Sequence, residues 1–244
     1  MPDLCIVVPC FNEEGRLRRD DFVDFLDTHP DATLCLVDDG STDGTCAALE
    51  RVQAARPTQV IVHRLALNQG KAEAVRQGVL DVAAGNRFDF IGYWDADLST
   101  PLDEVERVLR ILVEDANCRL VLGSRVKRLG ATIERRVVRH VMGRVFATFA
   151  SGILGLPVYD SQCGAKLFRR EVVETLFGAP FLTRWLFDLE MLARLRNAFG
   201  QAGLQMATEV PLGRWEDVRG SKLKLQDLVR VPLELLRIRA HYNR

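Results

Sequence analysis

The feature that most constrains the fold is a regular alternation of apolar runs with helix-like segments across the first half of the chain. Strand-like runs lie at 4–14, 32–38, 59–66, 88–99 and 119–125, and helix-like segments lie at 18–29, 46–56, 68–85 and 101–115. The first run carries Pro9, where we expect the strand to break. Strands that alternate with helices form a mostly parallel sheet covered by helices on both faces, so the sequence predicts an α/β fold.

From Gly130 onward, in the second half, the pattern of apolar and charged residues changes. A basic and apolar stretch covers 132–156, helix-like patterns cover 166–177 and 184–199, a last strand fits 209–215, and a C-terminal helix interrupted at Pro232 fits 224–242. No internal repeat or low-complexity linker divides the chain. Because 244 residues can bury one large core, we expect a single domain over 1–244.

The composition excludes several kinds of partner. The formal net charge is zero, so no overall field attracts nucleic acid, and we expect none. No apolar stretch approaches the roughly 20 residues that cross a bilayer, so we expect no transmembrane segment. The six cysteines are scattered, and with no signal peptide they indicate a reducing, cytoplasmic setting. Any membrane contact is then expected to be peripheral, on the cytoplasmic face.

Two carboxylates, Asp95 and Asp97, follow the fourth strand-like run in "FIGYWDADLSTP". A buried carboxylate is costly unless a partner offsets its charge. If the chain stays extended, the two side chains point the same way. Such a pair suits Mg²⁺ or Mn²⁺, which prefer oxygen ligands and bridge to substrate phosphates. The alternative is a pair of acids capping the helix that starts at Pro101, a role that fits Ser99 or Thr100 better.

Other polar residues follow neighbouring strands and are expected at the same edge of the sheet, where such sheets bind ligands. They are Asn12 and Glu13 after the first strand, and Asp38 and Asp39 after the second. Carboxylates recognise hydroxyl or imide donors, but "DDGSTDG" also has the composition of a turn. Lys71 in "NQGKAEA" could meet a phosphate at a helix start, although a surface lysine explains it equally well.

The motifs "IVVPCFNEE", "LVDDGSTDGT", "NQGKAEAVRQG" and "DADLS" resemble, in order and spacing, those of family two glycosyltransferases of the GT-A fold. In the second half, "DSQCGAKLFRRE", "RWLFDLEML" and "RWEDVRGSKL" are similar to polyprenyl-phosphate sugar synthases, the group of the dolichyl-phosphate β-glucosyltransferases. The resemblance covers nearly the whole chain. It implies an inverting, metal-dependent transferase that moves a sugar, glucose being expected, from a nucleotide sugar to a polyprenyl phosphate at a membrane surface.

The resemblance also assigns roles in the first half, 1–126, which it makes the donor-binding half. Residues that match the family's donor-binding or metal-binding positions are Pro9, Asn12, Glu13, Asp39, Asp95 and Asp97, the last two being the metal pair and Asp97 also catalytic. Asp38 and Lys71 complete the expected donor-binding set. Two departures stand out. Ser99 replaces a common glutamine two positions after the pair, which leaves a third metal ligand unassigned, and Ala72 replaces a common glycine.

In the acceptor half, 127–244, the family's chemistry requires cations for the lipid phosphate. A phosphate acceptor is already an anion, so it needs positive charge more than a general base. The expected phosphate-binding cations are Arg135, Arg136, Arg139, Lys166 and Lys222. Arg125 is expected to have a catalytic role. Because most arginines and lysines lie on protein surfaces, about half of these residues would be ordinary surface residues. Asp188, expected to be catalytic, matches the carboxylate that other family two enzymes use as a base toward hydroxyl acceptors, and here it is expected to orient the acceptor or a nearby arginine.

Two stretches, 135–156 and 228–242, combine basic and apolar residues in a way that suits a helix lying on a bilayer, or equally a packed core helix. Arg230, Arg237 and Arg239 are the cations of the second stretch. Alternatives within the fold are a GDP-mannose donor, a soluble hydroxyl acceptor, or a non-catalytic relative that binds nucleotide sugars. A signalling receiver domain also gathers acids at strand ends, but it would leave the second half unexplained.

Overall fold

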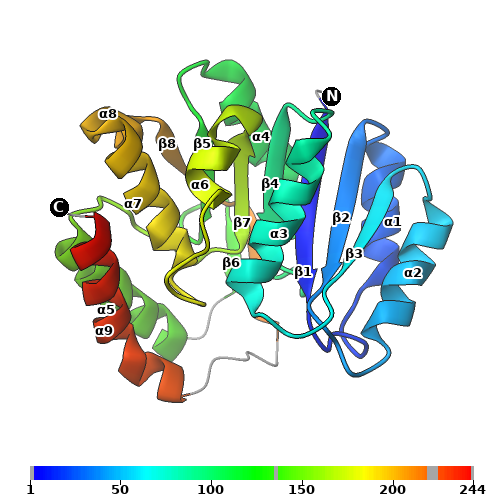
Figure 1. The fold of residues 1–244 in the computed structure, drawn as a ribbon, viewed down its shortest axis with the longest axis horizontal. Helices are drawn as coiled ribbons and strands as arrows, with labels where there is room; N and C mark the ends of the chain where they lie inside the picture. Colours follow the sequence, from blue (N-terminus) through cyan, green and yellow to red (C-terminus); the bar gives the residue numbers. More distant parts are fainter. Residues whose placement is uncertain (1–2, 135–136, 219–224, 243–244) are drawn as a thin grey trace.

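A computed structural model describes residues 3–134, 137–218 and 225–242 (Figure 1). Its main sheet has seven strands in the order β3-β2-β1-β4-β7-β5-β8. The strands are β1 Leu4–Cys10, β2 Ala32–Asp38, β3 Val60–Arg64, β4 Phe90–Trp94, β5 Leu120–Ser124, β7 Ala165–Arg169 and β8 Ala207–Pro211. β7 runs antiparallel to both of its neighbours, and the other pairs are parallel. A separate two-stranded ribbon pairs β6 Thr132–Glu134 with β9 Arg214–Glu216.

Helices cover both faces of the sheet, as the alternating pattern predicts. They are α1 Arg19–Thr28, α2 Thr45–Ala55, α3 Lys71–Ala84, α4 Glu104–Glu114, α5 Val137–Leu154, α6 Val173–Phe177, α7 Phe187–Phe199, α8 Gln201–Gln205 and α9 Leu225–Tyr242, with a 3₁₀ turn η1 at Arg170–Val172. Successive β1 residues belong to two different cores: Leu4, Ile6 and Val8 pack with α1, α2 and α4, while Cys5 and Val7 pack with α3, α6 and α7. The prediction of a mixed, mostly parallel α/β sheet is confirmed.

β7 is where the sequence interpretation of the second half is wrong. The helix-like pattern at 166–177 is in fact a strand followed by η1 and the short helix α6. The strand pairs with β4 on one side and β5 on the other, and it is buried through Phe168. A strand buried on both faces shows no period-two alternation. The apolar residues of α6 therefore extended a helical pattern backward over it.

Two prolines, Pro9 and Pro232, were expected to interrupt a strand and a helix, but both elements continue through them. β1 continues through Pro9 to Cys10, paired with β2 along its length, while its ladder with β4 has already ended at Val7. The missing Pro9 N–H therefore costs no ladder bond on the β4 side. Helix α9 likewise runs through Pro232, although an interior proline costs about 3 kcal/mol. Beyond it, Leu235 and Ile238 are fully buried, and their packing offsets that cost.

Loops at the carboxyl ends of β1, β2 and β4 meet at one edge of the sheet, because these strands are parallel neighbours. After β4 the chain does not stay extended as expected. It turns tightly, with the Leu98 N–H donating to the Asp95 carbonyl at 3.1 Å and Leu98 at a φ of 49°. Within the described residues, no helix is both long enough and apolar enough to cross a bilayer.

Candidate active site

The first carboxylate of the pair, Asp95, forms an ion pair with Lys71. Asp95 directly follows β4, and Lys71 is the first residue of α3, so neighbouring elements bring them together. The Lys71 Nζ lies 2.5 Å from Asp95 Oδ1. Burial by itself raises the pKa of Asp95, but the charge and hydrogen bond of Lys71, together with the charges of Lys166 and Arg125, outweigh burial, and the pKa falls below its usual value. Asp95 is therefore ionised at neutral pH.

A glycine makes room for this carboxylate. The Asp95 N–H donates to the carbonyl of Gly164 at 3.0 Å, which ties the end of β4 to the segment that leads into β7. A Cβ at Gly164 would lie 1.9 Å from Asp95 Oδ2, far closer than real atoms approach. Position 164 therefore tolerates no side chain while Asp95 keeps this conformation.

The second carboxylate, Asp97, lies in the turn after β4 and has a different environment. Its Oδ1 accepts the Ser99 N–H at 3.0 Å, so Ser99 braces this acid. Burial, and then the negative charge of Asp95, raise the pKa of Asp97. Two close carboxylates of which one resists ionisation form a site that a divalent cation would stabilise.

The oxygens of Asp95 and Asp97 thus fit a hard cation such as Mg²⁺ or Mn²⁺. No third acid, histidine or cysteine joins them in a cluster able to hold a metal among the described residues. Further oxygen ligands would therefore have to come from water or from a bound phosphate, as is common for Mg²⁺.

Asp188, the second residue of α7, is the hub of a buried network. Its Oδ1 accepts the Tyr93 hydroxyl and lies 2.8 Å from the Lys166 ammonium. Gln162 Nε2 donates to Oδ2 at 3.2 Å. The side chain of Asp188 is 5% exposed. Both of its oxygens are therefore occupied by donors from the protein itself.

Lys166 requires a correction, because it is not available to bind an acceptor phosphate. It lies on β7 with its side chain fully buried. Besides Asp188, its ammonium donates to the carbonyls of Ser161 at 2.9 Å and Cys163 at 2.6 Å. Three partners use all three of its N–H donors. Lys166 is the counter-ion of Asp188, not a phosphate ligand.

Arg125, just after β5, is held by a residue that sequence reasoning missed. Asp160 receives a two-pronged ion pair, with Nε–Oδ2 at 2.6 Å and a second contact to Oδ1 at 2.7 Å. The same carboxylate accepts the Arg125 N–H at 3.0 Å. Burial lowers the pKa of Arg125, but the hydrogen bond and charge of Asp160, with smaller contributions from Cys163 and Asp95, raise it by more, so the guanidinium stays charged. The only signal for Asp160 was its place in "DSQCG".

On the donor side, Asp39 organises the loop before α3. Its carboxylate accepts the N–H groups of Gln69 at 2.7 Å and Gly70 at 2.9 Å, and the side-chain amide of Asn68 at 2.9 Å. Burial raises the pKa of Asp39, although these hydrogen bonds work in the opposite direction. The neighbouring Asp38 accepts the Ser41 N–H at 3.0 Å. Asp38 therefore shapes the turn that "DDGSTDG" indicated, and Asp39 ties this turn to the loop before α3.

The loop after β1 is bonded to that turn. Asn12, at a φ of 48°, accepts the Thr42 N–H at 2.9 Å and donates its own N–H to Ser41. The Glu13 N–H donates to Thr45 Oγ1 at 2.7 Å, and its carboxylate pairs with Arg16. Pro9, half-buried near the end of β1, leads into this loop. Whether these residues contact a donor stays a prediction.

A second residue missed by sequence reasoning is Arg184. This exposed arginine lies across Gly70, with its Cδ 3.5 Å from where a Cβ would stand, and its charge acts on Asp39. It lines a cavity of about 450 Å³ together with Asn68, Gln69, Ala72, Glu73, Phe181, Leu182 and Thr183. Only its position in "RWLFDLEML" pointed to it.

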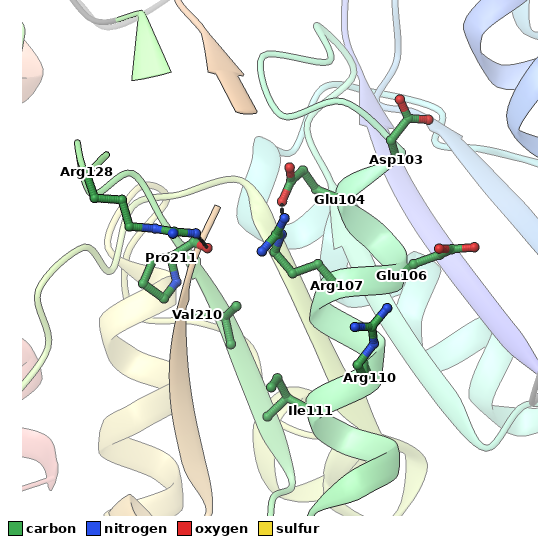
Figure 2. Close-up of a pocket in the computed structure, with 9 residues that line it drawn as sticks. All are labelled: Asp103, Glu104, Glu106, Arg107, Arg110, Ile111, Arg128, Val210 and Pro211. Atoms are coloured by element: carbon green, nitrogen blue, oxygen red, sulfur yellow. Dashed lines mark hydrogen bonds and ion pairs between the residues drawn. The ribbon is translucent and has the colours of Figure 1, made fainter. Parts of the chain in front are cut away.

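A groove larger than the cavity at Arg184 lies elsewhere, between α4 and β8 (Figure 2). Its volume is about 580 Å³, and it is lined by Asp103, Glu104, Glu106, Arg107, Arg110, Ile111, Arg128, Val210 and Pro211. Glu104 pairs with Arg107 at 3.0 Å and also accepts the N–H of Gly213, so much of its charge is already used. No residue predicted for the active site lines this groove.

Several predicted cations lie outside the described residues. Arg135, Arg136 and Lys222 fall there entirely. Arg139 belongs to α5 and Arg230 to α9, but their side chains are outside the described part of the structure. Their predicted contacts with phosphate or lipid therefore stay predictions.

The geometry agrees with the sequence comparison. The profile of glycosyl transferase family 2 matches residues 5–177, which contain every element of the site up to α6. The chain belongs to glycosyltransferase family 2.

Relatives align with almost the whole of this family 2 chain. A dolichyl-phosphate beta-glucosyltransferase from Saccharomyces cerevisiae is 30% identical over 98% of this chain and 75% of that protein. The human protein of that name is also 30% identical, with the same coverage. One from Trichomonas vaginalis is 29% identical over 96% of this chain and 72% of that protein.

Solved structures show the same fold. Glucosyl-3-phosphoglycerate synthase from Mycobacterium tuberculosis, in complex with uridine diphosphate, superposes with a TM-score of 0.68 at 21% identity, over 97% of this chain and 80% of that one. Mannosyl-3-phosphoglycerate synthase from Rubrobacter xylanophilus gives 0.70 at 19% identity, over 98% and 73%. The predicted GT-A fold and glycosyltransferase class are confirmed.

Proposed function

We propose that this family 2 glycosyltransferase moves glucose from UDP-glucose to a polyprenyl phosphate, with inversion at the sugar. The names of the relatives at 28–30% identity supply the sugar and the lipid phosphate. The neighbour from Mycobacterium tuberculosis, solved with Mn²⁺ and uridine-diphosphate-glucose, supplies the donor class and a divalent ion.

The observation that carries the proposal is the state of Asp188. A hydroxyl acceptor needs a base to remove its proton, and a base needs a free lone pair within reach of it. The carboxylate of Asp188 is buried and accepts from Tyr93, Gln162 and Lys166. An acceptor that arrives as a phosphate anion needs no such base. The engaged carboxylate therefore favours a lipid phosphate over the hydroxyl acceptors that other family members use.

The residues divide the work as follows. Asp95 and Asp97 would hold Mg²⁺ or Mn²⁺, which when bound stabilises negative charge on the diphosphate leaving group. Asp39 fixes the loop that ends at Lys71, and Lys71 lies beside Asp95 where the diphosphate is expected. The network of Asp188 holds α7 against β4 and β7 and so keeps the floor of the site rigid.

The acceptor half supplies a surface suited to a bilayer. Helices α5 and α9 pack side by side at the same end of the molecule (Figure 1). Phe149 on α5, and Leu233 and Leu236 on α9, are at least half exposed. We infer that they enter the bilayer interface on its cytoplasmic face, with Arg237 and Arg239 near the headgroups. Arg135, Arg139 and Lys222 remain the proposed ligands of the acceptor phosphate, and Arg125 keeps its predicted catalytic place.

A transfer assay tests the proposal. The purified chain is mixed with UDP-glucose, Mn²⁺ and vesicles that contain polyprenyl phosphate, and lipid-linked glucose is measured. Parallel arms replace the donor with GDP-mannose, or the acceptor with 3-phosphoglycerate. We expect glucose on the lipid, and about a hundredfold or greater loss for Asp97→Ala, the scale on which removing charge stabilisation slows transfer.

The control is Asp103→Ala, which removes an exposed acid a few residues away. It should transfer like the natural chain. Glucose on phosphoglycerate in place of the lipid would favour a soluble acceptor. UDP-glucose binding without any transfer would identify a non-catalytic relative.

A further inference from the structure

Lys71 occupies the place on Asp95 that a metal ion would take. Its ammonium is 2.5 Å from Asp95 Oδ1. The other oxygen, Oδ2, lies against the backbone at Gly164, which covers that side. A carboxylate holds Mg²⁺ at about 2.0–2.1 Å, so an ion and the ammonium cannot share one oxygen without strong repulsion. The ammonium must leave when the ion binds.

The protein offers the displaced ammonium no equivalent partner among the described residues around it. Asp188 acts on Lys71 through its charge, but its oxygens already accept from Lys166, Tyr93 and Gln162. Asp97 would be bound to the ion itself. The rings of Tyr93 and Phe187, 5.7 and 5.9 Å from the ammonium, give only weak cation–π contacts. A half-buried ammonium without a counter-ion is costly.

We propose that Lys71 couples the two ligands of the site, excluding the metal ion while the donor is absent and moving to a diphosphate oxygen when both ligands are bound. The proposal rests on the proposed function, because it takes the donor to be a nucleoside diphosphate sugar. The ion then binds weakly to the empty protein and tightly to the protein with nucleotide. By thermodynamic linkage, the ion raises the affinity for the nucleotide by the same factor.

The test measures Mn²⁺ binding directly. Mn²⁺ is titrated into the full chain with and without saturating UDP, and free ion is counted by electron paramagnetic resonance. Three variants are compared: Lys71→Met, Lys71→Arg, and Lys127→Met, which removes the same charge from an exposed lysine. Circular dichroism at each titration temperature confirms that all are folded.

In the natural chain we expect UDP to raise Mn²⁺ affinity by about tenfold or more, within the usual range of coupling. Lys71→Met should bind Mn²⁺ alone several-fold more tightly than the natural chain, and its enhancement by UDP should shrink. Lys71→Arg keeps the charge and should retain most of the coupling. Lys127→Met should match the natural chain.

Two outcomes overturn the proposal, and they differ from each other. If Lys71→Met binds Mn²⁺ alone no more tightly than Lys127→Met, while UDP still enhances binding, the metal site stands and the coupling role of Lys71 falls. If the natural chain binds no Mn²⁺ even with UDP, the proposed metal-dependent function falls too. In the same titration, Asp95→Asn is the reference for a site that lacks one of its two metal-binding carboxylates.

Discussion

At the residue scale, the centre of the site is a line of alternating charges. It runs from Asp97 and Asp95 through Lys71 to Asp188 and Lys166, with Tyr93 packed among them. Charges buried this way are stable only when each has a partner. Changing one member therefore affects the fold, the ligand affinity, or both, according to which partner it leaves alone.

Lys166→Met should destabilise the fold. The substitution leaves the Asp188 carboxylate buried without its counter-ion, and breaking one side of a buried pair typically costs about 3–5 kcal/mol. Urea unfolding followed by circular dichroism measures the change. Adding Asp188→Asn to Lys166→Met removes the stranded charge and should recover part of the loss. Equal midpoints for Lys166→Met and the natural chain would show that the pair contributes little.

Asp97→Asn should stabilise the metal-free protein at neutral pH. The pKa of Asp97 is raised in the folded state, so the folded protein binds a proton more tightly than the unfolded chain does. Ionisation of Asp97 therefore opposes folding in full above its raised folded pKa, and this penalty shrinks as the pH falls below that value and is lost below the ordinary pKa of the unfolded chain. Thermal unfolding midpoints are measured in chelator at several pH values. The midpoint of the variant should be higher than that of the natural chain at pH 7 and equal to it in acid.

The same substitution should remove the stabilisation that Mn²⁺ with UDP gives, since only an ion-binding site gains from ligand. Thermal midpoints with both ligands test this arm. A variant that is less stable than the natural chain at pH 7 would contradict the assigned repulsion between Asp95 and Asp97.

At the element scale, α9 is fastened to α7 by a small buried cluster. The Tyr242 hydroxyl donates to Glu190 Oε1 at 2.8 Å, and Arg194 pairs with the same oxygen at 2.9 Å. Burial, then Glu190, raises the pKa of Tyr242 to about 12. Arg194 also donates to the carbonyl of Leu176 in α6 and to those of Ala179 and Pro180 in the α6–α7 connection. The C-terminal end of α9 is therefore held by polar contacts as well as by its apolar face.

Tyr242→Phe should lower the free energy of unfolding by about 1 kcal/mol, the usual net value of a hydrogen bond, and more if Glu190 is left short of a donor. Thermal unfolding measures the change. Tyr159→Phe, on a partly exposed ring, is the matched control and should have little effect. If Tyr242→Phe leaves the free energy of unfolding unchanged, apolar packing alone holds α9 against α7.

The elements also show which parts of the fold a sequence pattern can predict. The alternation through 4–125 placed five strands and four helices correctly, because a parallel sheet imposes the same spacing on every unit. The pattern failed at β7, since a strand buried between two neighbours carries no periodic signal of its own. It also failed at the turn after Asp95, where a φ of 49° at Leu98 is a local conformation that composition does not announce.

The site shows a similar division. The order of the motifs predicted that Asp95, Asp97, Asp39 and Lys71 lie at one edge of the sheet, because residues at the ends of neighbouring parallel strands lie close together. Partners from distant segments, such as Asp160 for Arg125, required three-dimensional structure. So did the burial of Lys166, because a lysine in a sequence indicates exposure far more often than a counter-ion in a core.

At the scale of the whole molecule, the α5–α9 pair should govern binding to vesicles. Leu233→Glu with Leu236→Glu places two charges on the exposed apolar face and should weaken co-sedimentation with anionic vesicles at least tenfold, since each buried apolar side chain contributes about 1.5–3 kcal/mol. Transfer to a lipid acceptor in detergent should change much less.

The control is Val113→Glu, because Val113 is a half-exposed apolar residue on α4. It adds a charge of the same sign away from α5 and α9. If all variants sediment alike, a different face of the molecule meets the lipid.

The position of β7 bears on attempts to redesign this enzyme. A strand from the second half of the chain bridges β4 and β5 of the first, and the residue that precedes it, Gly164, packs against the acid Asp95. A chimera that joins the first half of this chain to the second half of a relative must therefore import a foreign strand into the middle of the sheet. Crossover points at the two ends of α5 would instead exchange a single helix of the second half while keeping β7 native.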